Sequence, residues 1–206
     1  MHLTSFCIWD ALKMSEYFDA EQIIITSASG KTGSGLGYAL QADKYAPKVI
    51  GMTSKRNLEM VKSLNLYDQC ATYKGLTEID LTKPTAIVDM AGNAKVMAAL
   101  HTALGNNMKW TINVGMTHVM NVRPHPGIIT ERSKFFFAPG HIQQRMKDWG
   151  PEGFNQKTGA FLMETAMKTQ KWLKFRKIDG LQGLAEIHHL VFAGQIDATE
   201  GLIVEM

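Results

Sequence analysis

The sequence has few cysteines and no long apolar run. Its 206 residues include only Cys7 and Cys70, with no CxxC pair and no spacing typical of metal ligands, which excludes a disulfide framework and favours a reducing compartment. No apolar run approaches the roughly 18 residues that a membrane span needs. The N-terminus lacks the basic segment and apolar core of a secretory signal. We therefore expect a cytoplasmic protein with no membrane partner.

The sequence also lacks the motifs of several enzyme classes. It contains seven histidines but no HExxH motif, and the adjacent His188 and His189 would face different directions on a helix, so we expect no metal site. The hydrolase elbow GxSxG is missing, because its nearest string, Gly33 to Gly35, falls at the start of an expected helix. A net charge of +3 on scattered basic residues does not indicate a nucleic-acid partner.

What the sequence contains is a globular composition with alternating strand and helix patterns. Hydrophobic residues make up 45% of the chain, enough for a real core. The alternation implies right-handed crossovers and an α/β fold with a doubly wound parallel sheet. The expected strands cover 22–27, 48–53, 69–73, 86–90, 110–115, 134–138 and 202–205, and the expected helices cover 3–17, 33–44, 57–64, 94–104, 141–149, 154–176 and 181–193. We expect a loop or lid over 116–133. We also expect a single domain over 1–206, in which 154–206 forms a helical extension with a short last strand.

A turn of small residues follows the first apolar strand. The β-branched run of residues 23–25 enters the stretch Thr26 to Gly37, which is rich in Ser, Ala and Gly and leads into the expected helix. Small residues allow the backbone to approach a ligand closely, and a helix start presents free N–H groups to an anion. The turn therefore predicts a nucleotide phosphate site.

Two kinds of phosphate-binding loop compete for this turn. The stretch Ser29 to Thr32 ends like the mononucleotide P-loop GxxxxGK[ST], and Asp89 follows a later strand, where a magnesium-holding carboxylate would lie. That motif needs a glycine five places before Gly30, and the residue there is Ile25. Only half of the P-loop motif is therefore present.

The alternative is the dinucleotide fingerprint GxGxxG, whose three positions are occupied by Ala28, Gly30 and Gly33. A second strand ends at Thr53, where an NAD site carries an acidic residue for the ribose 2′-hydroxyl. Here the chain continues instead with Ser54, Lys55 and Arg56, whose hydroxyl and cations would hold a 2′-phosphate. These residues favour NADP over NAD, although a solvated helix start would also account for the two cations.

Two later strand ends add glycines at the edge where open α/β sheets bind ligands. The first is Asp89 to Asn93 and the second is Val114 to His118. We expect Asn93 to cap the following helix. Asp89, Tyr67 and His118 could serve as an acid or base by location alone, and each has a structural alternative, so no catalytic residue is assigned.

Several blocks of the sequence resemble an uncharacterised family within the medium-chain dehydrogenase/reductase superfamily, near the quinone oxidoreductases. The blocks are Ser27 to Gly33, Val49 to Ser54, Leu66 to Tyr73, Val88 to Asn93, Phe136 to Pro139, Asp148 to Phe154, and Ala193 to Asp197 followed by Glu200 and Gly201. The resemblance covers nearly the whole chain and implies a Rossmann domain with NADP(H) as cofactor. Gly30 departs from the family's usual Ser-Ala-Ser-Ser-Lys-Thr and brings the loop closer to that of the quinone oxidoreductases.

The resemblance also implies positions for the cofactor. Residues of the first turn would lie by the pyrophosphate, those after the second strand by the 2′-phosphate, Tyr73 near the adenosine end, and the later glycine turns toward ribose and nicotinamide. The candidate cofactor-binding residues are Ser29, Gly30, Lys31, Thr32, Gly33, Thr53, Ser54, Lys55, Arg56, Tyr73, Ala91, Gly92, Gly115 and Met116.

The chain departs from the domain organisation of the superfamily in a way that affects its expected activity. Superfamily members carry a barrel-like domain before the Rossmann domain, and here only about twenty residues precede the first strand, so we expect that domain to be absent. The sequence then predicts an NADP(H)-binding reductase-like domain, transferring hydride to a carbonyl or quinone if another domain or subunit completes the cleft. A non-catalytic dinucleotide-binding or structural protein and a P-loop-like enzyme are the alternatives. We expect a small-molecule substrate, with a homo-oligomer as one option.

Overall fold

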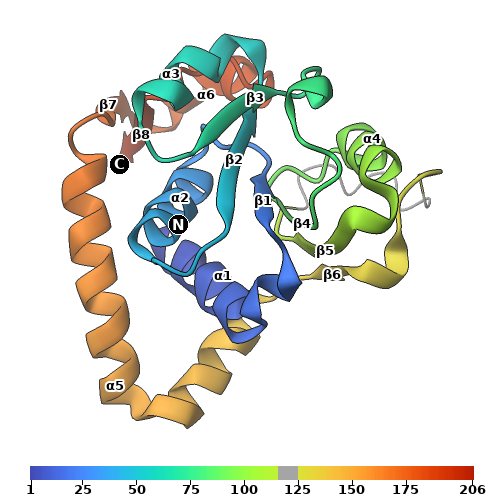
Figure 1. The fold of residues 1–206 in the computed structure, drawn as a ribbon. Helices are drawn as coiled ribbons and strands as arrows, with labels where there is room; N and C mark the ends of the chain where they lie inside the picture. The colour runs from blue at the N-terminus through green and yellow to red at the C-terminus, as the bar shows by residue number, and fades with distance from the viewer. Residues whose placement is uncertain (116–124) are drawn as a thin grey trace. The chain divides into compact units, whose positions relative to one another are not determined.

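The computed structural model describes residues 1–115 and 125–206 and divides into two compact units, 1–162 and 163–206. The first unit contains a six-stranded parallel sheet with the strand order β3-β2-β1-β4-β5-β6 (Figure 1). The strands are β1 (Gln22–Ile25), β2 (Lys48–Thr53), β3 (Gln69–Thr72), β4 (Thr85–Asp89), β5 (Met108–Asn113) and β6 (Ser133–Phe135). The chain order reverses between β1 and β4, as in a doubly wound fold, which confirms the predicted fold class.

Both faces of the sheet are covered, as the apolar strand sequences require. Alternate residues of β1 divide between two cores: Ile23 and Ile25 pack with helices α1 and α2, and Ile24 packs with α4. All three isoleucines are fully buried. The helices of this unit are α1 (His2–Met14), α2 (Lys31–Ala42), α3 (Leu58–Ser63), α4 (Ala94–Leu104) and the first part of α5 (Ala138–Thr169).

The N-terminal helix is shorter than the expected span of 3–17. It ends at Met14, and a tight turn, Glu16–Asp19, follows with positive φ at all four residues. Phe18 of this turn stacks on Trp110 of β5, with ring centroids 5.2 Å apart. The turn therefore brings the chain from α1 into the sheet.

The long helix α5 bends at Gly150, where φ is +72°, and Pro151 follows. A proline inside a helix removes one backbone hydrogen bond and produces such a bend. The expected helices 141–149 and 154–176 are thus two arms of one bent element (Figure 1). The prediction that the second arm extends to Arg176 is wrong, because the helix ends at Thr169 and a strand begins at Lys174.

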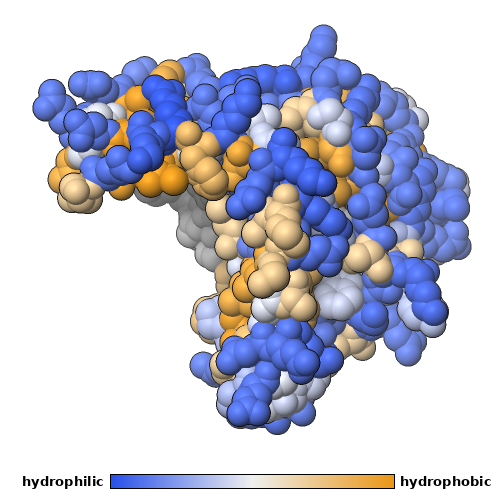
Figure 2. Space-filling model, turned by 90° about the vertical axis from the view of Figure 1, so that its left-hand side faces the viewer, coloured by the Kyte–Doolittle hydropathy of each residue, from blue (hydrophilic) through white to orange (hydrophobic). Residues whose placement is uncertain are grey.

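The second unit is a small βαβ arrangement. Its strands β7 (Lys174–Asp179) and β8 (Glu200–Glu205) pair in parallel, and α6 (Gly180–Phe192) connects them. The strand β7 was not expected, since its charged residues resemble a helix surface. Apolar side chains such as Phe175 and Phe192 stay exposed in this unit. On the face of the molecule in Figure 2, apolar patches lie between hydrophilic areas.

In the described ranges, no helix is long and apolar enough to cross a bilayer. The same ranges hold no group of three or more His, Cys, Asp or Glu residues placed to bind a metal ion. The expected loop over 116–133 lies partly outside the described residues; its described end contains the turn Thr130–Arg132, and Ser133 already belongs to β6.

Candidate functional site

A crevice lies at the carboxyl edge of the sheet, beside the point where the strand order reverses. Its pocket of about 300 Å³ is formed by the turn after β1, the start of α2 and the ends of β4 and β5. Open α/β sheets bind ligands at this position. The pocket is lined by Thr4, Ser27, Gly30, Lys31, Thr32, Gly33, Met90, Val114 and Gly115.

The glycines of the crevice sit where a side chain would not fit. A Cβ on Gly33 would lie 2.8 Å from the carbonyl oxygen of Ser27 and 3.2 Å from Cα of Ala28. A Cβ on Gly115 would lie 2.0 Å from the carbonyl oxygen of Met90. The start of α2 therefore packs directly on the turn after β1, and the chain after β5 packs directly on the chain after β4. At both positions only a glycine permits this close approach of two backbone segments.

The turn after β1 is held in place by side chains from the neighbouring strands. The Tyr73 hydroxyl accepts the backbone N–H of Ser27 at 3.0 Å, and the Tyr67 hydroxyl donates to the carbonyl of Ala28 at 2.9 Å. Burial raises the pKa of the Tyr67 phenol, which keeps it protonated and able to donate. Ser27 adopts a left-handed conformation with φ of +51°, which costs free energy for a non-glycine residue. The two tyrosines stabilise this conformation.

Asp89 at the end of β4 orders the next turn. Its carboxylate accepts Thr26 Oγ1 at 2.6 Å and the backbone N–H groups of Ala91 and Gly92 at 3.1 and 3.0 Å. Asp89 is almost fully buried. These bonds match the structural alternative for Asp89, and they use three of the about four acceptor positions of its carboxylate, so Asp89 is poorly placed to hold the magnesium ion of the P-loop interpretation.

Asn93 follows in the same turn and caps α4, as expected. Its side-chain oxygen accepts the backbone N–H groups of Lys95 and Val96 at 3.1 and 3.3 Å. Two of the free donors at the start of α4 are thereby satisfied.

The cationic corner, which we define as Ser54, Lys55 and Arg56, follows β2 at the same edge of the sheet. Ser54 is half-buried, and both cationic residues are exposed in a short turn before α3. Because β1 and β2 are neighbouring parallel strands, the corner and the turn after β1 lie side by side. Thr53 is buried, and its hydroxyl bonds to Ser29 Oγ at 3.1 Å.

The structure brings most of the candidate residues together at the carboxyl ends of four strands, β1, β2, β4 and β5, with differences in detail. Ala91 and Gly92 lie in the turn held by Asp89, next to Met90 of the pocket. Tyr73, expected near an adenosine, directs its hydroxyl to the turn after β1. Met116 and His118 lie outside the described residues.

Thr4, which is not among the residues expected from the sequence, lines the crevice from the first turn of α1. The helix α1 packs along α2, and Ser5 Oγ donates to the carbonyl of Thr32 at 2.8 Å. A Cβ on Gly35 would lie 2.5 Å from Ser5 Oγ, so the missing side chain permits this close packing. No local signal marks Thr4, since its position depends on how α1 docks.

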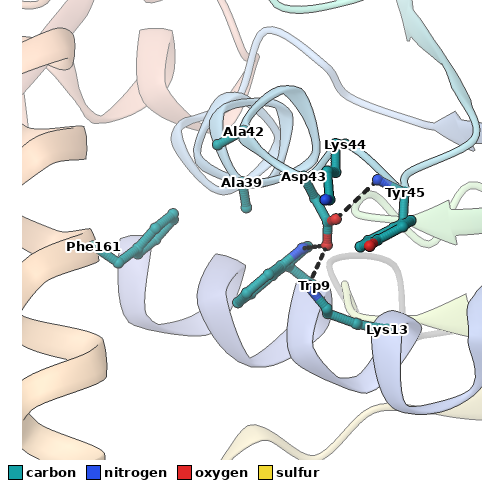
Figure 3. Close-up of a pocket in the computed structure, with 8 residues that line it drawn as sticks. All are labelled: Trp9, Lys13, Ala39, Ala42, Asp43, Lys44, Tyr45 and Phe161. Atoms are coloured by element: carbon teal, nitrogen blue, oxygen red, sulfur yellow. Dashed lines mark hydrogen bonds and ion pairs between the residues drawn. The ribbon is translucent and has the colours of Figure 1, made fainter.

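A second pocket, of about 390 Å³, lies at the other end of α2 and is mostly apolar (Figure 3). Trp9 and Phe161 form its aromatic walls, and Asp43 is its buried polar group. The Asp43 carboxylate accepts Trp9 Nε1, Lys13 Nζ and the Tyr17 hydroxyl at 3.0, 2.9 and 2.8 Å. Burial opposes its ionisation, but these hydrogen bonds outweigh burial and lower its pKa to about 2. Asp43 therefore joins α1 to α2 and is not available to a ligand.

The fold and the glycine-lined crevice define a Rossmann-like α/β domain. The chain belongs to the family described as "Protein of unknown function (DUF2855)", which matches residues 1–197. No curated protein matches the sequence.

Solved structures with the same fold include three whose descriptions name the bound coenzyme. CurA of Vibrio vulnificus in complex with NADPH is 15% identical, with a TM-score of 0.59 over 94% of this chain and 60% of that one. YhdH of E. coli K-12 with bound NADPH is 15% identical, with a TM-score of 0.62 over 98% and 60%. The YhdH oxidoreductase of Salmonella enterica in complex with NADP is 14% identical, with a TM-score of 0.61 over 100% and 60%. The chain thus spans about 60% of the length of these structures.

Proposed function

We propose that this chain is an NADP(H)-binding, reductase-like domain. One observation carries the proposal: a glycine turn opening a helix and a cationic corner stand side by side at the carboxyl edge of one parallel sheet. The first feature suits a diphosphate and the second a 2′-phosphate. The proteins of this fold described with NADPH or NADP support the same assignment.

The residues present fit a dinucleotide along this edge. The start of α2 packs directly on the turn after β1 at Gly33, and its N-cap residue Gly30 makes no side-chain cap bond, so the backbone at this helix start can approach and bind a diphosphate. Ser54, Lys55 and Arg56 would hold the 2′-phosphate by hydrogen bonds and charge. The turns that contain Ala91, Gly92 and Gly115 would lie beside the ribose and nicotinamide.

When bound, the coenzyme supplies a hydride, which is two electrons and one proton, to a carbonyl or quinone. The chain's own contribution is to position the nicotinamide end at the pocket that Thr4, Val114 and Gly115 line. Hydride transfer requires a site from which water is excluded. We therefore propose that turnover depends on another domain or subunit that closes the crevice, and that the substrate is a small molecule.

The test is a titration of the purified chain with NADPH and with NADH, followed by coenzyme fluorescence. We expect NADPH to bind more tightly than NADH. The Lys55→Ala/Arg56→Ala variant should weaken NADPH binding about tenfold to hundredfold, because each charge-assisted contact contributes on the order of tenfold, and NADH binding should change little.

The matched control removes two positive charges at the opposite edge of the sheet, in Lys83→Ala/Lys109→Ala. Lys83 precedes β4 and forms an exposed ion pair with Glu21, and Lys109 is exposed at the start of β5. This variant should bind both coenzymes like the wild type. Equal weakening of NADPH and NADH by the corner variant would refute the 2′-phosphate assignment, and tighter binding of Mg-ATP than of NADPH would favour a mononucleotide enzyme.

A further inference from the structure

The turn after β1 and the cationic corner are connected through a single side chain, Ser29. Its Oγ accepts a hydrogen bond from Thr53 Oγ1 at 3.1 Å and another from Asn57 Nδ2 at 3.1 Å. Thr53 immediately precedes the corner and Asn57 immediately follows it. The backbone reinforces this arrangement, because the N–H of Asn57 donates to the carbonyl of Ser54 at 3.0 Å.

These two bonds determine what Ser29 can offer a ligand. A hydroxyl oxygen has two acceptor sites and one hydrogen to donate. Thr53 and Asn57 fill both acceptor sites, so the hydroxyl of Ser29 can take part in a further hydrogen bond only as a donor. The described part of the chain shows no acceptor for that hydrogen. A phosphate oxygen is an acceptor only, so a phosphate is the ligand group that suits a hydroxyl fixed in this way.

Position supports the same conclusion. Ser29 directly precedes Gly30, which lines the crevice pocket, and it bonds to the residues on both sides of the corner. It therefore stands between the site proposed for the diphosphate and the site proposed for the 2′-phosphate. Asn57 is only half-buried and bonds to Ser29 near the surface, so its amide is not part of the buried core.

We propose that Asn57 is a positioning residue for the phosphorylated coenzyme. By filling an acceptor site of Ser29, it fixes that hydroxyl as a donor to the 2′-phosphate, which NADH lacks, and joins the geometry of the corner to that of the turn after β1. This inference deepens the proposed function and rests on it. Asn57 acts through Ser29, and it distinguishes NADPH from NADH together with the corner.

The test is a double-mutant cycle on NADPH and NADH affinity with Ser29→Ala, Asn57→Ala and the double variant. Asn57→Ala should weaken NADPH binding about three- to tenfold, the effect of one hydrogen bond, and NADH binding less. In the Ser29→Ala background the Asn57 change should have little further effect, because its partner oxygen is already gone. Asn57→Asp, whose carboxylate would accept the Ser29 hydrogen and repel a phosphate, should reduce the preference for NADPH further.

The control is Asn106→Ala, an exposed asparagine in the turn Gly105–Asn107 at the opposite edge of the sheet, which should leave both affinities unchanged. Equal weakening of both coenzymes by Asn57→Ala, or full additivity with Ser29→Ala, would overturn the inference while leaving the proposed function intact. A wild-type chain that binds no NADPH would overturn both. Thermal unfolding of each variant separates a loss of fold from a loss of recognition, and an unfolded Asn57→Ala variant would itself contradict a positioning role.

Discussion

Replacing Gly33 by alanine tests the close contact at the start of α2. The added Cβ would lie 2.8 Å from the carbonyl oxygen of Ser27 and 3.2 Å from Cα of Ala28. Both neighbours are backbone atoms, so neither can rotate away, and the start of α2 must move outward by some tenths of an ångström. Overpacking of this kind costs about 1–3 kcal/mol, whereas alanine gains about 1 kcal/mol over glycine within a helix.

A matched variant, Gly159→Ala, separates the cost of overpacking from the gain in helix propensity. Gly159 lies in α5, and a Cβ there would meet nothing within 4 Å. We expect Gly159→Ala to stabilise the chain by up to about 1 kcal/mol, and Gly33→Ala to be less stable than it by about 1–3 kcal/mol. Urea unfolding followed by circular dichroism measures the difference. Equal stability of the two variants would refute the close contact.

The same pair of variants tests the location of the diphosphate. Moving the start of α2 displaces the backbone N–H groups that the proposed function assigns to an anion. NADPH and NADH share the diphosphate, so Gly33→Ala should weaken both by about tenfold or more, the effect of about 1.4 kcal/mol, and Gly159→Ala should weaken neither. Wild-type affinity for both coenzymes in Gly33→Ala would mean that the diphosphate does not lie on this turn.

Three further predictions concern stability. Asp43→Asn should lower the free energy of unfolding by about 2 kcal/mol in urea at pH 7, because the amide cannot accept all the donors that the carboxylate accepts. The pKa of Asp43 in the folded chain, about 2, lies below the ordinary value of 3.8, so the difference from wild type should shrink as the pH falls from 4 to 2. A difference that stays constant over this range would contradict the prediction. Burial and the nearby Arg132 lower the pKa of His101 to about 4, so the free energy of unfolding of the wild type should fall by about 2 kcal/mol from pH 7.5 to pH 5. The free energy of unfolding of His101→Gln should change less over this range, and an equal fall in the variant would refute the role of His101. Gly51→Ala should destabilise the chain by about 1–3 kcal/mol, because its Cβ would lie 2.7 Å from the Tyr67 ring, and an unchanged melting temperature would refute that contact.

The pH prediction for His101 follows from its hydrogen bonds. Its Nδ1 accepts the backbone N–H of Ile129 at 2.9 Å, so its Nε2 carries the hydrogen and donates to Thr111 Oγ1 at 3.0 Å. A second proton on the ring would remove the acceptor for Ile129. Because the folded pKa is below the ordinary value of 6.5, the unfolded chain takes up a proton first as the pH falls, and folding loses free energy between pH 6.5 and 4.

The core of the fold could be predicted from the sequence because its signals are local. The run of three isoleucines in β1 has the length and β-branching of a buried parallel strand, and the small residues after it mark the turn. The strand β7 could not be found in this way. Lys174, Arg176 and Lys177 resemble the polar face of a helix, and only pairing with β8 identifies them as a strand.

The candidate site was predictable in its glycines and its cations, and less so in its supporting residues. A glycine after a strand carries its own signal, whereas the roles of Thr4 and Asn57 depend on side chains far away in sequence. Tyr67 shows the same limit. Its position after α3 suggests core packing, and only the folded chain shows its hydroxyl 2.9 Å from the carbonyl of Ala28.

A crystal structure of the chain with NADPH bound tests the proposed coenzyme site directly. We predict that the diphosphate lies against the backbone of Gly30 to Gly33, and that the 2′-phosphate lies within hydrogen-bond distance of Ser54 and the two cations that follow it. Electron density for the coenzyme at another edge of the sheet, or a 2′-phosphate directed away from Lys55 and Arg56, would contradict this prediction.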